Sequence, residues 1–396
     1  MATQDLRMGA AAPRVALLYN PRFRSIITQV VVALALIALI AWFVDNTITN
    51  LRRANIASGF GFLYSRAGFD ISFSLIPYTN DSTYLRAIAV GTLNTILVAV
   101  MGIVTATIIG FIVGVGRLSR NWLIRAISTV YVETFRNIPP LLVIFFWYFG
   151  VISALPTVRD SIALPFGSFL NSRGFFFPKV IWGEGAWLIP VAFIVAIALV
   201  LFVRSRAKAR QEATGQRFPV VWTSIALLIG LPLLAFFVSG MPATLDFPKK
   251  SVFNLTGGMT LAPELLSLYL ALSFYTASFI AEIVRAGIRG VSKGQTEAAY
   301  ALGLRPRSAL NLVVVPQAMR IAIPPLASQY LNLTKNSSLA IAIGFPDLVA
   351  IGGTTLNQTG QSVEVVVLWL VIYLAISLVT SAFMNWFNAR VALVER

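Results

Sequence analysis

Eight long apolar segments constrain the fold of this chain more than any other feature of its sequence. They cover residues 26–44, 88–115, 129–152, 187–203, 220–240, 262–285, 321–345 and 364–386. A helix of about 20 apolar residues crosses the hydrocarbon core of a bilayer, and a lipid-exposed backbone must satisfy its own hydrogen bonds. We therefore predict an all-α, polytopic integral membrane protein with about eight transmembrane helices. The seventh segment is the least regular, because it contains Pro324, Pro325 and several polar residues.

The composition supports the membrane class and excludes several kinds of function. Of the 396 residues, 57% are hydrophobic and 12% are charged, whereas a soluble domain carries roughly a quarter charged residues. The net charge of +16 does not indicate a nucleic-acid partner, because the basic residues are spread over short loops rather than along one face. The sequence has no cysteine and no histidine. Disulfides, Cys/His metal sites and Ser-His-Asp catalysis are therefore excluded, and we expect no metal site.

The distribution of lysine and arginine predicts the orientation in the membrane. Of 31 such residues, 20 lie in the two termini and in loops 116–128, 204–219 and 285–320, and 9 lie in the remaining loops. Because cytoplasmic loops are enriched in these residues, we expect both termini in the cytoplasm, as an even number of spans requires. The basic N-terminus lacks a short apolar core followed by a small-residue cleavage site, so we expect no cleaved signal peptide.

Two long loops on the expected outer side, 45–87 and 153–186, are rich in glycine, proline and aromatic residues with balanced charge. We predict that they are folded lids; anchoring of the aromatic rings at the membrane interface is the alternative. On the opposite side, the stretch 204–217 is interpreted as a solvated basic turn near anionic headgroups.

The basic loop 285–320 contains a helix signal followed by a stop signal. Thr296 or Gln295 can cap a short helix at Glu297, whose carboxylate would lie in the favourable first turn. Gly303 can adopt the left-handed conformation that ends a helix. We therefore predict a short helix that ends at a glycine corner.

A second helix is expected over 306–315, because Pro306 suits the first turn of a helix and Pro316 would break it before the next span. The result is a helix–glycine–helix element parallel to the membrane. Ala298 and Ala299 would leave a patch of small residues that another protein could approach closely. An ordinary amphipathic loop is the alternative interpretation.

The pattern Glu297-Ala298-Ala299, Gly303 and Pro316 resembles the EAA loop of ABC-transporter importer permeases, with Val313 and Val315 as mild departures. The flanking sequences resemble the polar amino-acid (histidine/glutamine-type) permease branch, and they cover 273–304, 314–344 and 131–150. The resemblance implies a type I ABC importer permease core with extra N-terminal and central helices. The layout is similar to the larger permease subunit of general, broad-specificity L-amino-acid uptake systems of Gram-negative bacteria.

On this resemblance we divide the chain into four segments. They are 1–87 (basic cytoplasmic tail, first span and outer loop), 88–152 (first part of the permease core), 153–261 (insert with an outer loop and two extra spans) and 262–396 (second part of the core, with coupling loop 285–320).

The resemblance also implies a role for the loop and a set of partners. In that family the EAA element is a coupling helix seated in a groove of an ATPase subunit, so Glu297 would be the polar contact and Gly303 the turn. The sequence contains no Walker A pattern, so ATP and magnesium would be bound by a partner, and this chain would bind no cofactor and catalyse no reaction. A second, different permease, a periplasmic solute-binding protein and a location in the bacterial inner membrane are implied as well.

Polar residues within the apolar segments are candidates for the substrate pathway, because charges in hydrocarbon usually face protein or water. They are Glu133, Arg136, Glu282, Asn332, Lys335, Asn336 and Ser337. A zwitterionic amino acid needs an anion for its ammonium group and donors for its carboxylate, which these residues could supply. The alternative is that they satisfy one another: Glu133 and Arg136, three apart on one helical face, could pair. The Pro139-Pro140 step that follows them is expected to break the helix. Asn336 stands where many relatives have aspartate.

Three functions remain to be compared. The first is an ABC-importer membrane subunit for amino acids. The second is a stand-alone, ion-coupled secondary transporter, which would require an inverted internal repeat and acidic ion sites; the halves of the sequence show no convincing repeat. The third is an integral-membrane enzyme, for which the histidines, cysteines and metal-binding acidic clusters are lacking.

Overall fold

The computed structural model describes residues 21–53, 58–216, 218–251 and 254–391. Within them, seven helical segments are long and apolar enough to cross a membrane, and a bent pair makes an eighth if it counts as one span. This finding confirms the predicted polytopic helical protein with about eight spans. The predicted basic tail up to residue 20 and the last five residues lie outside the described residues.

The spans are α1 (Pro21–Arg53), α2 (Tyr84–Gly116), the bent pair of α3 (Trp122–Arg136) with α4 (Pro140–Phe145) and η3 (Phe146–Ile152), α5 (Leu188–Thr214), α6 (Val220–Val238), α7 (Pro263–Arg289), a segment built from α9 (Pro306–Ala309), η5 (Leu310–Val314), α10 (Val315–Asn336) and η6 (Ser337–Ile343), and α12 (Ser362–Val391). The shorter helices are η2 (Phe60–Tyr64), η4 (Pro165–Gly167), α8 (Lys293–Ala301) and α11 (Leu348–Thr359).

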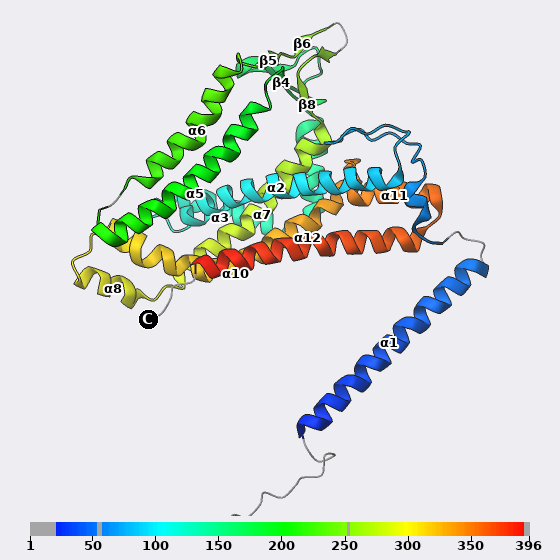
Figure 1. Ribbon diagram of the computed structural model, residues 1–396, viewed down its shortest axis with the longest axis horizontal. Helices are drawn as coiled ribbons and strands as arrows, with labels where there is room; N and C mark the ends of the chain where they lie inside the picture. The colour runs from blue at the N-terminus through cyan, green and yellow to red at the C-terminus, as the bar shows by residue number, and fades with distance from the viewer. Residues whose placement is uncertain (1–20, 54–57, 217, 252–253, 392–396) are drawn as a thin grey trace, which may run out of the picture.

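The core of the molecule is the packing of α2 along α7, with α10 against both (Figure 1). Glycines on α2 let the two backbones approach closely. A Cβ on Gly110 would lie 2.5 Å from Cγ2 of Ile280, and one on Gly114 would lie 2.7 Å from the Ala281 carbonyl oxygen. Small residues at helix crossings are the usual means of close packing in membranes, where the hydrophobic effect does not drive helices together.

The predicted span 129–152 is not one straight helix. Its two halves, α3 and α4–η3, meet at 111°, at the Pro139-Pro140 step that the sequence marks as a break. Proline removes a backbone donor and clashes with the preceding turn, so the chain changes direction here. The predicted break is therefore confirmed.

The prediction that Pro316 breaks the helix is also wrong. The helical segment runs from Pro306 through Pro316 to Ile343 as one span, so residues 306–315 begin a membrane helix and do not form a separate surface helix. A π-helical stretch, η5, immediately precedes Pro316. Such a stretch changes the hydrogen-bonding register, so the missing N–H of proline is accommodated without a break.

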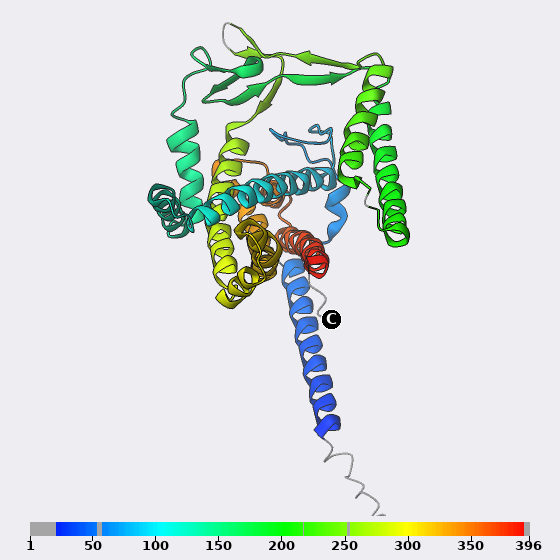
Figure 2. The same cartoon turned by 90° about the vertical axis from the view of Figure 1, so that its left-hand side faces the viewer.

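Loop 153–186 is folded, as predicted, together with residues that follow α6. The short antiparallel strands are β1 (Ile162–Leu164), β2 (Ser168–Asn171), β3 (Gly174–Phe177), β4 (Lys179–Trp182), β5 (Ala243–Asp246), β6 (Lys249–Lys250), β7 (Leu255–Thr256) and β8 (Met259–Leu261). They form one sheet in the order β1-β2-β3-β8 and two pairs, β4-β5 and β6-β7. These strands are an addition to the all-α prediction, and Figure 2 shows them as a layer across the ends of α5, α6 and α7.

Loop 45–87 is folded too, where it is described. Phe62, Ala67 and Tyr84 are buried in a small cluster with Val365 of α12. The backbone N–H of Gly59 donates to Glu364 Oε1 at 2.6 Å. The first outer loop therefore packs on the ends of α2 and α12.

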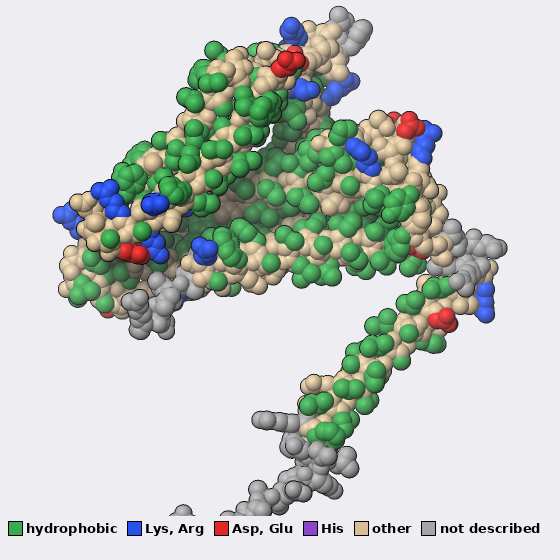
Figure 3. Space-filling view, in the orientation of Figure 1, with side chains coloured by type: hydrophobic (Ala, Val, Ile, Leu, Met, Phe, Trp, Pro, Cys, Tyr) green, Lys and Arg blue, Asp and Glu red, His purple; other side chains and the backbone are tan. Residues whose placement is uncertain are grey.

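Two parts of the chain stand away from the core. Helix α1 extends from it, and its apolar segment has no buried residues (Figure 1), as suits a helix surrounded by lipid. Helices α5 and α6 pack on each other as a hairpin, and Figure 3 shows a hollow between this hairpin and the core. The α2–α3 turn, the α5–α6 turn and α8 gather at the end of the molecule opposite the strands, which we call the α8 end (Figure 1).

Candidate functional site

The predicted glycine corner is present, and its hydrogen bonds explain it. Gly303 has φ +75°, in the left-handed region. The N–H of Gly303 donates to the carbonyl of Tyr300 at 2.9 Å, and the N–H of Leu304 donates to the carbonyl of Ala299 at 3.1 Å. These two bonds are the Schellman motif, in which a glycine after the last helical turn satisfies the free carbonyls. The sequence therefore terminates α8 at this glycine.

The beginning of α8 differs from the prediction. The helix starts at Lys293 with Ser292 as N-cap, not at Thr296 or Gln295. Glu297 is consequently in the second turn, so its carboxylate does not lie among the free N–H groups of the helix start. Its side chain is exposed at the surface of α8, where it is available to another molecule.

The two alanines of the motif face opposite ways. Ala298 is exposed, whereas Ala299 is 3% exposed and packs toward the following segment, in which Ala309 is 1% exposed. The predicted two-alanine patch is therefore wrong for Ala299, which is small because α8 lies close to α9. The exposed surface around the corner is instead apolar and large: Leu302 is 82% exposed and Tyr300 is 49% exposed.

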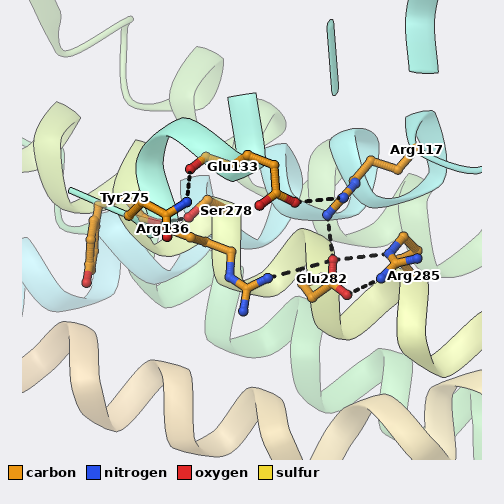
Figure 4. Close-up of polar contacts among 8 residues, drawn as sticks. Arg117, Glu133, Arg136, Tyr275, Ser278, Glu282 and Arg285 are labelled. Atoms are coloured by element: carbon orange, nitrogen blue, oxygen red, sulfur yellow. Dashed lines mark hydrogen bonds and ion pairs between the residues drawn. The ribbon is translucent and has the colours of Figure 1, made fainter. Parts of the chain in front are cut away.

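A charge network joins α2, α3 and α7 (Figure 4). Glu282 accepts from Arg117 Nη1 at 2.5 Å and from Arg285 Nε at 3.1 Å. Arg136 Nη1 lies 3.9 Å from the same carboxylate. Arg117 also donates from Nη2 to Glu133 Oε1 at 3.0 Å. The network holds three arginines and two glutamates, and it joins α7 to the consecutive helices α2 and α3, which are distant from it in sequence.

Glu133 and Arg136 are both in this network, but they do not pair with each other as predicted. The side chain of Glu133 reaches Arg117, and Arg136 turns toward Glu282 and lies over the ring of Phe279 at 5.6 Å. The Arg117 side chain is 10% exposed and that of Glu282 is 23% exposed, against 55% for Glu133. Glu282 is thus the central, half-buried anion of a structural network, and Glu133 is at its rim.

The polar stretch at the end of α10 lies where the α-helix changes into a 3₁₀ helix. The α-helix ends at Asn336 and continues as the 3₁₀ turn η6. Asn332 and Lys335 are exposed and share one face, Asn336 is half-buried, and Ser337 is buried with its hydroxyl donating to the Thr334 carbonyl at 2.7 Å. Of these predicted pathway residues, Asn332 and Lys335 are the most accessible.

Lys335 lies at the edge of an open cavity of about 430 Å³ between η6, α11 and α12. Trp369 and Tyr373 of α12 form part of its wall, together with Ser338. Lys335 makes no ion pair within the described part of the chain. A cation of this kind, beside aromatic rings and a hydroxyl, can bind a carboxylate.

A second polar cluster was missed in the sequence. Asn94 and Thr95 are fully buried in α2 and bind the chain before α11: Asn94 Nδ2 donates to the Pro346 carbonyl at 2.8 Å, and Thr95 Oγ1 accepts from the Leu348 N–H at 3.1 Å. Asp347 caps α11 by accepting from the Ala350 N–H at 2.8 Å. The signal was an aspartate one residue before an apolar helical segment, which is typical of an N-cap.

Burial raises the pKa of the Asp347 carboxyl to about 7, against the lowering effects of its hydrogen bonds to backbone N–H groups and of the Tyr373 hydroxyl. Its second oxygen, Oδ2, is buried, and so is this neighbouring hydroxyl. A buried carboxylate is costly in its charged form, so burial favours the neutral form.

The described geometry can be compared with known proteins. Residues 213–393 match the family described as binding-protein-dependent transport system inner membrane component. The chain is 62% identical over 379 residues to the general L-amino acid transport system permease protein AapQ of Rhizobium johnstonii, covering 96% of this chain and 95% of that protein. It is 48% identical over 378 residues to the putative amino-acid ABC transporter permease protein YhdX of Escherichia coli, covering 95% and 96%. This chain belongs to the amino-acid permeases of ABC transporters.

The similarity extends over the whole permease. The chain is also 44% identical over 412 aligned positions to the glutamate/glutamine/aspartate/asparagine transport system permease protein BztB of Rhodobacter capsulatus, covering 96% of both chains. Alignments this long include α1 and the strand-bearing insert, so these relatives share both additions to the core. As a permease of this class, the chain is a transport subunit, and ATP hydrolysis belongs to a separate ATPase.

Proposed function

We propose that this permease carries amino acids across the bacterial inner membrane, driven by a separate ATPase that docks on the corner between α8 and α9. The observation that carries the proposal is the exposure of this corner: Glu297, Tyr300 and Leu302 point outward around a left-handed glycine. The corner lies in a polar, basic loop outside the apolar part of the spans, so an apolar surface exposed there suits coverage by a protein partner rather than by lipid tails. The span that follows begins at this corner and contains both the π-helical stretch and Pro316.

In this proposal ATP and magnesium are bound by the ATPase, and no cofactor is bound by this chain. A second, different permease would complete the membrane pathway, and a periplasmic solute-binding protein would deliver the substrate, in keeping with the family description. Both termini and the α8 end would face the cytoplasm, and the strands would face the periplasm. The excess of lysine and arginine in the loops of the α8 end supports this orientation.

The amino-acid substrate is supported by the relatives, which are named as L-amino-acid and glutamate/aspartate-type systems. Lys335 would bind the substrate carboxylate, with Asn332 on the same face of α10. Asn336 and Ser337 would shape the end of the helix. Glu282, Glu133 and Arg136 would hold the helices of the pathway in register, because their charges are engaged in the network.

The docking role is tested by a charge reversal with a matched control. The full importer is purified with the variant Glu297→Lys or with Glu212→Lys, which reverses another exposed glutamate at the α8 end. We expect Glu297→Lys to lose the co-purifying ATPase and ATP-driven uptake, while Glu212→Lys retains both. Intact association in Glu297→Lys contradicts the docking role.

The substrate role is tested by Lys335→Ala and Lys335→Arg in the same importer. We expect the alanine variant to raise the KM for uptake and the arginine variant to restore it in part, since arginine keeps the charge. Equal KM values in all three proteins contradict the role of Lys335.

Uptake by the lone chain on an ion gradient supports the secondary transporter instead.

A further inference from the structure

The α8 end of the α5–α6 hairpin contains a basic pocket that the transport function does not use. The pocket has a volume of about 210 Å³. Its walls are Phe202, Val203, Arg206, Ala207, Arg210 and Phe218. Two guanidinium groups therefore face a concave, otherwise apolar surface.

The position of this pocket along α5 corresponds to the headgroup region of a membrane. The apolar segment of α5 ends at Val203, and Arg206 and Arg210 follow three and seven residues later. At 1.5 Å per residue, they lie about 5 Å and about 10 Å beyond the hydrocarbon boundary. The polar layer of a bilayer is about 5–8 Å thick on each side, so the backbone of Arg206 lies within it and that of Arg210 lies just beyond it, from where its long side chain can reach back to the headgroups.

The two arginines are held in place while their charges remain available. The guanidinium of Arg206 lies over the ring of Phe202 at 5.1 Å, and Arg210 Nη2 donates to Gln216 Oε1 at 3.0 Å. Within the described residues, neither arginine forms an ion pair, and the nearby Glu212 pairs with Lys208 at 3.8 Å. Five N–H donors per guanidinium suit a phosphate, which can be bound by a bidentate contact.

We propose that this pocket binds the headgroup of an anionic phospholipid, with the phosphate on Arg206 and Arg210 and an acyl chain along Phe202 and the exposed apolar face of α5. Leu199 and Val195, three and seven residues before Phe202 on α5, are exposed as Phe202 is, so an apolar surface for an acyl chain extends from the pocket along the helix. Basic pockets between membrane helices are known to select anionic headgroups. Lipid binding itself does not depend on the proposed membrane orientation. The assignment of the lipid to the cytoplasmic leaflet does rest on it.

The test compares two double variants of the purified full chain, each of which removes two positive charges from α5. Arg206→Gln/Arg210→Gln removes the pocket charges, and Arg204→Gln/Lys208→Gln removes charges that do not line the pocket. Native mass spectrometry in detergent measures the binding of phosphatidylglycerol, with phosphatidylcholine of the same acyl chains as the neutral probe. Inorganic phosphate is added as a competitor.

We expect the pocket variant to bind phosphatidylglycerol about 30-fold more weakly, from about 1 kcal/mol for each basic residue near an anionic headgroup. The control variant should change binding less than about threefold, and phosphatidylcholine should bind weakly to all three proteins. Equal loss in both variants, equal binding of the neutral lipid, or displacement by millimolar phosphate each overturns the proposal. If the glutamine variant does not fold, Arg206→Lys/Arg210→Lys takes its place. This variant keeps both charges but loses the bidentate guanidinium groups, so its affinity for phosphatidylglycerol should fall by less than about 30-fold but by more than that of the control variant.

The leaflet is tested separately. The sequence has no cysteine, so Ala209→Cys carries the single thiol of the chain. A membrane-impermeant maleimide should label it from the cytoplasmic side. Labelling from outside contradicts the proposed orientation of the permease and the leaflet, but it leaves the lipid binding measured above unaffected.

Discussion

Replacing Glu282 by glutamine should destabilise the helix core rather than alter substrate affinity. Arg117 is 10% exposed and Glu282 is its closest acidic contact. The substitution removes the negative charge to which both Arg117 and Arg285 donate, and Arg136 loses its long contact at 3.9 Å.

The expected magnitude follows from the number and exposure of these contacts. A hydrogen bond to a charged group contributes about 1.5–3 kcal/mol. Three such bonds are affected, one from Arg117 and two from Arg285. Glutamine keeps one acceptor oxygen, however, and Arg285 is partly exposed to water, so only part of their contribution is lost. We therefore expect a loss of about 2–4 kcal/mol in the free energy of unfolding, or roughly 30- to 1,000-fold in the unfolding equilibrium.

Glu133→Gln is the matched control, since Glu133 also contacts Arg117 but its side chain is 55% exposed. An exposed ion pair contributes less than about 1 kcal/mol, so this variant should remain close to the wild type. The assay is reversible unfolding of the purified chain in mixed micelles, with the KM for ATP-driven uptake measured in parallel. If Glu282→Gln unfolds like the wild type while its KM rises tenfold, Glu282 is a substrate ligand and our reasoning is refuted.

Three further predictions concern the glycines and the buried carboxyl. Gly303→Ala should weaken ATPase association, and Gly303→Asn should weaken it less. A Cβ at this position meets no atom within 4 Å, so the cost is the left-handed backbone conformation, about 1–2 kcal/mol, which asparagine tolerates better than alanine. Co-purification of the ATPase measures the difference. Gly110→Leu should prevent α2 from packing on Ile280. The expected result is a lower thermal stability and a loss of uptake, and unchanged stability contradicts the packing. For Asp347, the raised pKa of about 7 means that the folded state holds the proton more tightly than the unfolded state, so its contribution to stability falls as pH rises from about 4 to 7. Asp347→Asn should therefore flatten the pH dependence of thermal unfolding between pH 5 and 7.5, and an unchanged slope contradicts the assignment.

The parts of the fold that sequence reasoning predicted are those with a local cause. Apolar length predicted the spans, a proline pair predicted the bend after α3, and Gly303 predicted the end of α8. Each of these signals lies within one continuous segment of the chain. The wrong prediction at Pro316 has a local cause as well, because a π-helical stretch accommodates a proline that an ideal α-helix would not.

The parts that could not be predicted depend on contacts between distant segments. Glu133 is three residues from Arg136, but its partner is Arg117, which lies 16 residues earlier at the end of the preceding helix. The central anion, Glu282, lies 165 residues from Arg117 along the chain. The burial of Ala299 depends on where α9 lies. The strands of the insert pair residues before α5 with residues after α6. Neither short segment has a hydrophobic periodicity from which this pairing could be predicted.

The central claim is that the corner after α8 is covered from the cytosol by a separate ATPase. The most direct measurement uses Leu302→Cys, which places the single thiol of the chain on the most exposed part of the corner. In sealed membrane vesicles of known orientation, an impermeant maleimide should reach this thiol from the cytoplasmic side alone, and added ATPase should protect it. Labelling from the periplasmic side, or labelling that the ATPase does not slow, contradicts the account.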